Sequence, residues 1–366
     1  MNPLRVLLSG GGTGGHIFPA ISVANEIRKK YPDTEFLFVG AIGKMEMEKV
    51  PAAGYKIIGL PVVGIQRKLS LSNLFFPFKL IASLRKAKKI MKNFRPDVVI
   101  GTGGYASGPA LYVASKLKIP TLIQEQNSFA GITNKWLAKR VNRICVAYSG
   151  MENFFPAEKI MLTGNPIRQD ILETVNKKPE ALAHFNLNPT KKTLLVIGGS
   201  LGARTINIAI GNGLEKFSEN GIQLIWQTGK NYFETARAQS KAYEEKGIKA
   251  FDFISRMDLA YSAADVVISR AGASSVSELC VAAKPSILVP SPNVAEDHQT
   301  KNANALTQVN AAILIRDNEA LTRLVSDAIK LLGNNSQQEE LKKNIAKLAI
   351  PNSAEKIANE IYKLLK

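Results

Sequence analysis

The chain has 366 residues, of which 45% are hydrophobic and 21% charged, so it is long enough for two globular domains with separate cores. Its formal net charge of +18 favours an anionic partner, which can be nucleic acid, a membrane surface or a phosphorylated substrate. No apolar run approaches the roughly 20 residues of a membrane-spanning helix, and no signal-peptide core precedes the first glycines, which predicts a cytoplasmic protein. Cys145 and Cys280 lie in apolar segments without a metal-binding pattern, so we expect two reduced core residues.

Short aliphatic runs alternate with helix-length segments along most of the chain, a pattern typical of βαβ units and parallel sheets. A breaker cluster at residues 163–166 places the domain boundary at residue 165. The chain is therefore predicted to be an α/β protein with two parallel-sheet domains, 1–165 and 166–366, and terminal helices at about 337–366 that pack back toward the first domain. The predicted strands are residues 4–9, 34–39, 56–60, 97–100, 121–123 and 143–146 in the first domain, and 193–197, 223–226, 250–253, 265–269 and 286–289 in the second.

Three turns at predicted strand ends are rich in glycine: residues 10–16 (GGGTGGH), 101–108 (GTGGYASG) and 198–202 (GGSLG). A glycine turn that leads into a helix offers backbone N–H groups and the positive end of the helix dipole to an anion, usually a phosphate. Strand ends of a parallel sheet converge on one crevice, so the turns at 10–16 and 101–108 should line one wall and hold one diphosphate. We therefore predict two phosphate-bearing ligands on two similar domains that face one cleft.

The first turn also fits the dinucleotide fingerprint Gly10-x-Gly12-x-x-Gly15, but the second predicted strand ends at Val39 and Gly40 without the acidic residue that holds the ribose of NAD. NAD is therefore disfavoured. His16 follows at the helix start, where the dipole favours the neutral imidazole of a general base. The alternative is a histidine that only caps its own helix.

Polar residues also follow the strand at 121–123, in the order Gln124, Glu125, Gln126 and Asn127. We expect these side chains at the crevice rather than in a core, because amides and carboxylates are suitable partners for sugar hydroxyls. A structural role for Glu125 is equally compatible with the sequence.

In the second domain, residues 269–278 read as a strand end, a turn of small residues and a helix start that carries Glu278. This carboxylate could accept hydrogen bonds from both hydroxyls of a ribose while the backbone N–H groups hold phosphate. A capping box from Ser275 to Glu278 fits the spacing equally well. Residues 296–303 gather polar groups at another predicted helix start, which suits either sugar recognition or plain solvation.

Residues 69–95 account for part of the positive charge, since they predict a basic amphipathic helix. Phe78 and Ile81 are expected among the lysines and arginines, with Phe75 and Phe76 just upstream. Apolar groups amid cations suit a surface that lies on anionic lipid, whereas a solvated basic face is the alternative. Nucleic acid is disfavoured because no aromatic stacking platform is evident. The inner face is predicted to comprise Leu80, Leu84, Ala87, Met91 and Phe94, and the outer face Lys79, Arg85, Lys86, Lys89 and Lys92.

With these motifs in view, the chain resembles the MurG family, bacterial enzymes that attach N-acetylglucosamine to the lipid-linked muramyl-peptide precursor of peptidoglycan. The resemblance runs from residue 10 to about residue 305. The motifs that carry it are GGTGGH at 11–16, GGY at 103–105, EQN at 125–127, GNPIR at 164–168, GGS at 198–200 and HQTKNA at 298–303.

The resemblance implies a GT-B type fold, two Rossmann-like domains facing a central cleft, with UDP-N-acetylglucosamine as co-substrate. Helix dipoles and Arg168 would stabilise the leaving diphosphate, and the sequence shows no dense Asp/Glu set, so we expect no tightly bound cofactor and no metal. Uracil would lie near Ile254, the ribose on Glu278, and the donor sugar on Gln299. Phosphate would lie on Ser200, Ala273, Ser274, Ser275, Val276 and Ser277, and the donor site would be completed by Thr13, Gly14, Gly15, Asn127 and Arg168.

On the acceptor side, the resemblance implies that the lipid-linked muramyl peptide places its diphosphate by Gly12, Gly103, Gly104 and Tyr105. His16, alone or with Glu125, would be the base of an inverting transfer. The protein would be peripheral on the cytoplasmic face of the bacterial inner membrane, without nucleic acid. The anionic membrane would meet Phe75, Phe76, Phe78, Lys79, Ile81, Arg85, Lys86 and Lys89.

Three alternatives remain at this point. A UDP-N-acetylglucosamine 2-epimerase or another UDP-sugar transferase could use the same two-domain plan. A basic protein that binds membrane or nucleic acid without catalysis is the third.

Overall fold

The computed structural model describes residues 3–62, 76–173, 177–199 and 202–365. The chain forms two compact units. Unit 1 comprises Met1–Ile167 together with Asn352–Lys366, and unit 2 comprises Arg168–Pro351. The division lies close to the boundary expected at residue 165. Of the predicted terminal helices, α14 (Asn335–Ala346) belongs to unit 2 and α15 (Ser353–Leu364) to unit 1.

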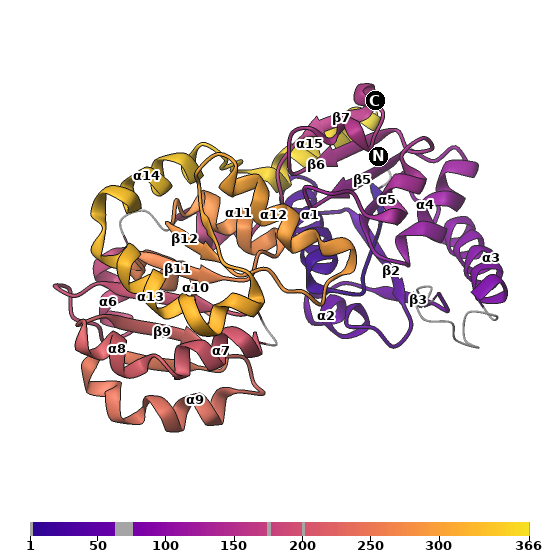
Figure 1. Cartoon of the computed structure of the whole chain (residues 1–366). Helices are drawn as coiled ribbons and strands as arrows, with labels where there is room; N and C mark the ends of the chain where they lie inside the picture. The colour runs from indigo at the N-terminus through magenta and orange to yellow at the C-terminus, as the bar shows by residue number, and fades with distance from the viewer. Residues whose placement is uncertain (1–2, 63–75, 174–176, 200–201, 366) are drawn as a thin grey trace. The chain divides into compact units, whose positions relative to one another are not determined.

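Unit 1 is built on a parallel sheet whose described strands run in the order β3-β2-β1-β4-β5-β6-β7 (Figure 1). The predicted strands are all present, with ends that differ by a few residues. The sequence did not predict β7, because three residues without an alternating pattern give no strand signal. The strands are β1 (Arg5–Gly10), β2 (Glu35–Ala41), β3 (Ile57–Leu60), β4 (Val98–Gly103), β5 (Thr121–Glu125), β6 (Arg143–Val146) and β7 (Ile160–Leu162).

Helices cover both faces of this sheet, because successive residues of each strand point to opposite sides. Val6 and Leu8 of β1 pack in one core cluster with α1 and α15, and Leu7 packs in another with α3 and α4. Figure 1 shows α15 beside α1, which explains why the end of the chain completes a core that the first residues begin. The α-helices are α1 (Gly14–Lys30), α2 (Glu46–Ala52), α3 (Phe76–Phe94), α4 (Ser107–Lys116), α5 (Ile132–Leu137) and α15, with short 3-10 turns at η2 (Met151–Asn153) and η3 (Ala157–Lys159).

Unit 2 repeats the plan with described strands in the order β10-β9-β8-β11-β12-β13, again all parallel. The sequence missed β13, which has only two residues. The strands are β8 (Thr193–Ile197), β9 (Gln223–Gln227), β10 (Ile248–Phe251), β11 (Val266–Ser269), β12 (Ser286–Leu288) and β13 (Ile313–Leu314). The α-helices are α6 (Lys178–His184), α7 (Arg204–Gly211), α8 (Leu214–Glu219), α9 (Phe233–Ser240), α10 (Met257–Ala263), α11 (Ala273–Val281), α12 (His298–Thr307), α13 (Ala320–Gly333) and α14.

Short 3-10 turns complete unit 2 at η4 (Gln169–Glu173), η5 (Lys241–Lys246), η6 (Ala295–Asp297) and η7 (Asp317–Glu319). Cys145 and Cys280 are buried free thiols, as predicted, and burial raises the pKa of each to about 12. In the described part of the chain, no helix has the length and apolar character needed to cross a bilayer.

Candidate functional site

In unit 1, the glycine-rich turns at 10–16 and 101–108 interlock at the ends of two neighbouring strands, β1 and β4. The N–H of Gly11 donates to the carbonyl oxygen of Gly103 over 3.3 Å. Gly104 has a φ of +85°, and a Cβ built on it would lie 2.2 Å from the oxygen of Gly11, so only glycine allows this approach. The prediction that both turns line one wall is therefore confirmed.

His16 lies at this junction and is fixed from two sides. It is the third residue of α1, whose N-cap is Thr13, so the alternative that His16 caps its own helix does not apply. Its Nδ1 lies 3.0 Å from the oxygen of Gly11, and its own carbonyl accepts a hydrogen bond from Thr102 over 2.6 Å. Because a carbonyl oxygen can only accept, Nδ1 carries the proton in the neutral ring and the lone pair lies on Nε2.

A residue that sequence analysis did not single out completes this junction. The carboxylate of Glu46, the first residue of α2, is fully buried and accepts the N–H of Gly12 over 2.9 Å. The N–H of Gly12 is therefore already taken by a carboxylate of the same unit, and the place of Gly12 beside the acceptor diphosphate stays a prediction. Tyr105, also expected at the diphosphate, is 54% exposed on the turn after β4.

The polar residues at the end of β5 and just after it differ from the expectation that they face a crevice. Gln124, Glu125 and Gln126 are at most 2% exposed. The side chain of Gln124 donates to that of Asn165 over 2.9 Å, and Asn165 in turn donates to the carbonyl oxygen of Gln126 over 2.9 Å. The expectation is wrong for these three side chains, because neighbouring strands, loops and α5 of unit 1 supply hydrogen-bond partners that hold them in the interior.

Glu125 organises the loop that follows it. One carboxylate oxygen accepts the N–H of Asn127 at 3.1 Å, and the other accepts the N–H of Gly131 at 3.0 Å and the side-chain amide of Asn134 at 2.9 Å. Of the two interpretations that the sequence left open, the geometry favours the structural one. We therefore assign Glu125 to holding Asn127 in place rather than to proton transfer.

In unit 2, Glu278 lies in the second turn of α11, facing two partners. Its Oε2 accepts a hydrogen bond from the hydroxyl of Tyr261 over 3.0 Å, and its Oε1 lies 3.8 Å from Nε of Arg168. The N-cap of α11 is Gly272, without a side-chain cap, so the capping box from Ser275 to Glu278 is excluded. Burial raises the pKa of Glu278, and the Arg168 charge opposes that rise.

The expected phosphate contacts lie on the first turns of α11, where Ala273, Ser274, Ser275, Val276 and Ser277 follow the turn after β11. A helix start offers N–H groups that lack an intrahelical acceptor. Ser200, expected to share this role, lies outside the described residues.

The expected uracil position at Ile254 is held by a side chain that sequence analysis missed. Gln227, the last residue of β9, accepts the N–H of Ile254 through Oε1 over 2.9 Å and donates to the carbonyl of Gly199 over 3.4 Å. The available signal was its place at a strand end. Gln227 thus joins the loop that carries Ile254 to the glycine-rich turn that follows β8.

Contacts from Arg270 and Gln299 fix the loop after β12. Arg270, which directly follows β11, donates to the carbonyl oxygens of Val289 and Pro290 over 3.0 and 3.1 Å and pairs with Asp317. Gln299 accepts the N–H of Ser291 over 2.9 Å. The side chain expected to contact the donor sugar is thereby anchored to the loop.

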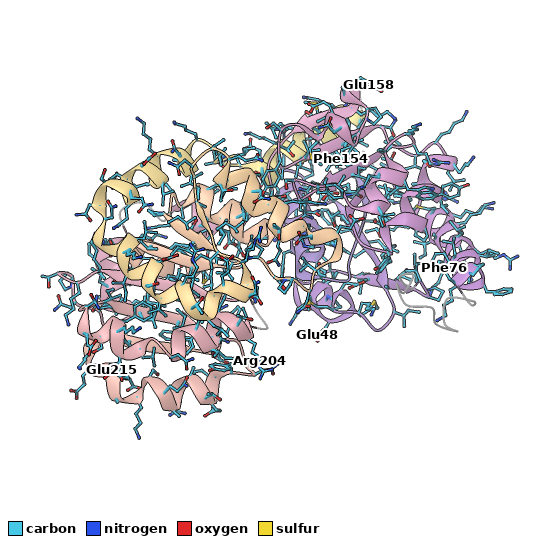
Figure 2. All side chains as sticks on the ribbon, in the orientation of Figure 1. Glu48, Phe76, Phe154, Glu158, Arg204 and Glu215 are labelled. Carbon is cyan, nitrogen blue, oxygen red and sulfur yellow. The ribbon has the colours of Figure 1, made fainter. Side chains whose placement is uncertain are left out.

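The outer surface of α3 has the predicted character. Phe78 is 70% and Ile81 47% exposed, whereas Ala87 and Met91 are buried against the sheet. Phe76 begins the helix (Figure 2), and Phe75 lies outside the described residues. Between 76 and 94 the sequence holds six lysines and arginines and no acidic residue: Lys79, Arg85, Lys86, Lys88, Lys89 and Lys92.

Among the residues that the structure describes, no three histidine, cysteine, aspartate or glutamate side chains gather as a metal site would require. The candidate groups are His16 with the backbone of the glycine-rich turns in unit 1, and the Glu278–Arg168 pair with the start of α11 in unit 2.

Two α/β units on parallel sheets, each with glycine-rich turns at the strand ends, define a GT-B type glycosyltransferase fold. Residues 6–146 match the glycosyltransferase family 28 N-terminal domain, and residues 193–361 match the family 28 C-terminal domain. The chain belongs to glycosyltransferase family 28.

Relatives cover the chain from end to end. The UDP-N-acetylglucosamine–N-acetylmuramyl-(pentapeptide) pyrophosphoryl-undecaprenol N-acetylglucosamine transferase of Parabacteroides distasonis is 57% identical, covering 100% of this chain and 99% of its own. The protein of the same name from Christiangramia forsetii is 55% identical, covering 99% and 98%. The crystal structure of MurG from Acinetobacter baumannii is 30% identical with a TM-score of 0.81, covering 99% of this chain and 100% of its own.

Proposed function

We propose that this protein transfers N-acetylglucosamine from UDP-N-acetylglucosamine to the 4-hydroxyl of the muramyl sugar in the undecaprenyl-diphosphate-linked muramyl peptide. The observation that carries this proposal is the 57% identity, over the full length, to a transferase named for this donor and acceptor. The interlocked turns that fix His16 in unit 1, and the oriented carboxylate of Glu278 in unit 2, support it.

The proposed reaction inverts the anomeric carbon in a single displacement. Nε2 of His16 removes the proton from the muramyl 4-hydroxyl, whose oxygen attacks that carbon through an oxocarbenium-like transition state. The bond from the anomeric carbon to the diphosphate oxygen breaks, and UDP leaves with the bonding electrons. A proton transfer of this kind is typically worth about 10²- to 10⁴-fold in rate.

Unit 2 is proposed to hold the donor. The hydrogen bond from Tyr261 and the nearby Arg168 orient the two oxygens of Glu278 for the ribose hydroxyls, and the start of α11 stabilises the departing diphosphate. Uracil would lie by Ile254 and the donor sugar by Gln299. The donor site is proposed to be completed by Thr13, the N-cap of α1, by Gly14 and Gly15, the first two residues of that helix, and by Asn127 after β5. No resident cofactor or metal enters this scheme.

Unit 1 is proposed to bind the acceptor and to contact the membrane surface. The turn after β4, with Gly103, Gly104 and Tyr105, is proposed to bind the acceptor diphosphate. The exposed Phe78 and Ile81, with Lys86 and Lys89, suit an anionic bilayer that carries the lipid tail. The protein would then act peripherally on the cytoplasmic face of the inner membrane.

The test is the transfer of labelled N-acetylglucosamine to a lipid-diphosphate muramyl peptide, with UDP release measured in parallel. His16→Ala should lower turnover by about 10²- to 10⁴-fold and leave UDP-N-acetylglucosamine binding unchanged. Unchanged turnover would remove His16 from the base role. Incubation with UDP-N-acetylglucosamine alone separates the alternatives, since a 2-epimerase would form the manno epimer without acceptor.

A further inference from the structure

Glu46 is a buried carboxylate that meets only backbone donors within the described structure. It is 0% exposed; its Oε1 accepts the N–H of Ala41 and its Oε2 the N–H of Gly12, each over 2.9 Å. Among the described residues, no lysine, arginine or histidine forms an ion pair with it. A buried carboxylate satisfied in this way is a strong acceptor with both oxygens fixed in place.

The second partner of Glu46 leads directly to His16. The N–H of Gly12 and the carbonyl of Gly11 belong to one peptide group, and that carbonyl is the partner of His16 Nδ1 at 3.0 Å. In a planar trans peptide the two groups point in opposite directions. The carboxylate and the imidazole therefore bind opposite ends of one peptide dipole.

The fold leaves room for this arrangement by means of glycine. A Cβ on Gly11 would lie 2.1 Å from Oε1 of Glu46, and one on Gly40 would lie 2.5 Å from its Cγ. A Cβ on Gly103 would lie 3.0 Å from Nε2 of His16. Any side chain at Gly11 or Gly40 would displace the carboxylate, and one at Gly103 would crowd the imidazole.

We propose that Glu46 is a positioning residue for His16, acting through the Gly11–Gly12 peptide group. Its negative charge polarises that peptide, which strengthens the hydrogen bond from Nδ1 and keeps the basic lone pair on Nε2. The same polarisation stabilises the imidazolium that forms when Nε2 accepts a proton. In hydrolase triads a carboxylate binds the histidine directly, whereas here one peptide group stands between them.

This inference rests on the proposed role of His16, and a double-mutant cycle distinguishes the two. Glu46→Gln should lower turnover by about 10- to 100-fold, the loss expected for a charge-assisted hydrogen bond, with donor affinity unchanged. In a His16→Ala background the same substitution should have no further effect. An equal loss in both backgrounds would overturn the inference. An unaltered turnover in His16→Ala alone would instead overturn the proposed function.

Nitrogen-15 NMR supplies a readout of the His16 tautomer that does not depend on turnover. The chain has three histidines, so the His16 signals can be assigned by their loss in His16→Ala. The wild-type neutral ring should be protonated at Nδ1, and Glu46→Gln should shift the population toward protonation at Nε2. An Nε2-protonated wild-type ring, or a tautomer population that Glu46→Gln leaves unchanged, would overturn the inference.

Two control variants match different properties of Glu46. Glu48, on the same helix (Figure 2), has a side chain 79% exposed, so Glu48→Gln tests a change of charge near the site. Glu360 is 5% exposed on α15, where it pairs with Arg143 and Lys363, so Glu360→Gln tests the loss of a buried carboxylate in the same unit. Neither should change the His16 tautomer.

Discussion

The hydroxyl of Tyr261, on α10, donates a hydrogen bond over 3.0 Å to the carboxylate of Glu278 on α11. Burial holds the pKa of Tyr261 well above its usual value, and the Glu278 charge raises it further, so the phenol stays protonated and remains a donor. The carboxylate oxygen that Tyr261 binds cannot rotate freely. Both carboxylate oxygens of Glu278 are therefore oriented before a ligand that hydrogen-bonds to them is bound.

Tyr261→Phe should weaken the binding of UDP-N-acetylglucosamine by about tenfold, because one hydrogen bond to a charged group is lost. Calorimetric titration with the nucleotide measures this directly. Tyr243→Phe, beside the edge strand β10, is the control and should bind as the wild type does. Equal affinity of the Tyr261 variant and the wild type would show that Glu278 needs no orienting donor.

Glu278→Gln should lower donor affinity by at least about tenfold at neutral pH, where the wild-type carboxylate is charged. Burial raises the pKa of Glu278 above 4.5, against the opposing charge of Arg168 and with the support of Asp170. Wild-type affinity should therefore fall as the pH drops through that raised pKa, and the variant should show no such fall. If the donor affinities of the wild type and Glu278→Gln changed with pH in the same way across the acid range, the assignment of Glu278 to donor binding would be contradicted.

The same raised pKa makes a prediction for stability. A carboxyl whose folded pKa exceeds its unfolded pKa opposes folding when charged, so its cost appears as the pH rises through those values. Glu278→Gln should therefore be at least as stable as the wild type at neutral pH. Thermal unfolding checks this and separates lost affinity from lost fold.

Asp258→Asn should destabilise unit 2 by about 1–3 kcal/mol, because Arg256 and Lys177 lose a buried acceptor. The hydrogen bond from Arg256 lowers the pKa of Asp258 to about 2, although burial opposes this. The stabilisation is thus complete above the ordinary pKa of 3.8 and is lost as the pH falls toward 2. Urea unfolding at several pH values measures it.

The control is Asp327→Asn, which breaks an ion pair with Arg323 four residues away on the surface of α13. Exposed pairs of this kind contribute about 0.3–0.5 kcal/mol. If both aspartate variants lost equal stability at neutral pH, the burial of Asp258 would have no special effect.

Lys86→Glu with Lys89→Glu should reduce binding to vesicles of anionic phospholipid by at least tenfold, since each cation near such a surface contributes about 1 kcal/mol. Phe78→Ser with Ile81→Ser should also reduce it, by removing inserted apolar area. Turnover on a soluble short-chain acceptor should persist in both. Co-sedimentation measures binding, with Lys342→Glu and Lys343→Glu on α14 as the charge-matched control.

The sequence predicts most of this fold because its strands are aliphatic runs separated by helix-length segments. It misses β7 and β13, since two or three residues carry no periodicity. Phe78 and Ile81 were predicted to be exposed because a helical wheel fixes directions on a single element. The same method cannot reach side chains whose surroundings come from several loops.

Glu46 and Glu48 show this limit within one helix. Both lie in the run MEMEKV, yet Glu46 is fully buried and Glu48 extends into solvent. The difference comes from the backbone donors of Ala41 and Gly12, which the fold brings to one glutamate only. Gln124 to Gln126 were misjudged for the same reason, because Asn165 reaches them from a distant part of the chain.

The return of α15 to unit 1 has a consequence for biosynthesis. Ile357, Ala358 and Ile361 close the core cluster that Val6 and Leu8 begin, so the amino-terminal unit cannot bury that face until the last residues have left the ribosome. Residues 168–351 of unit 2 are all added between the two parts of unit 1. The unit whose residues are made first therefore waits, with one core face uncovered, while the whole of unit 2 is synthesised.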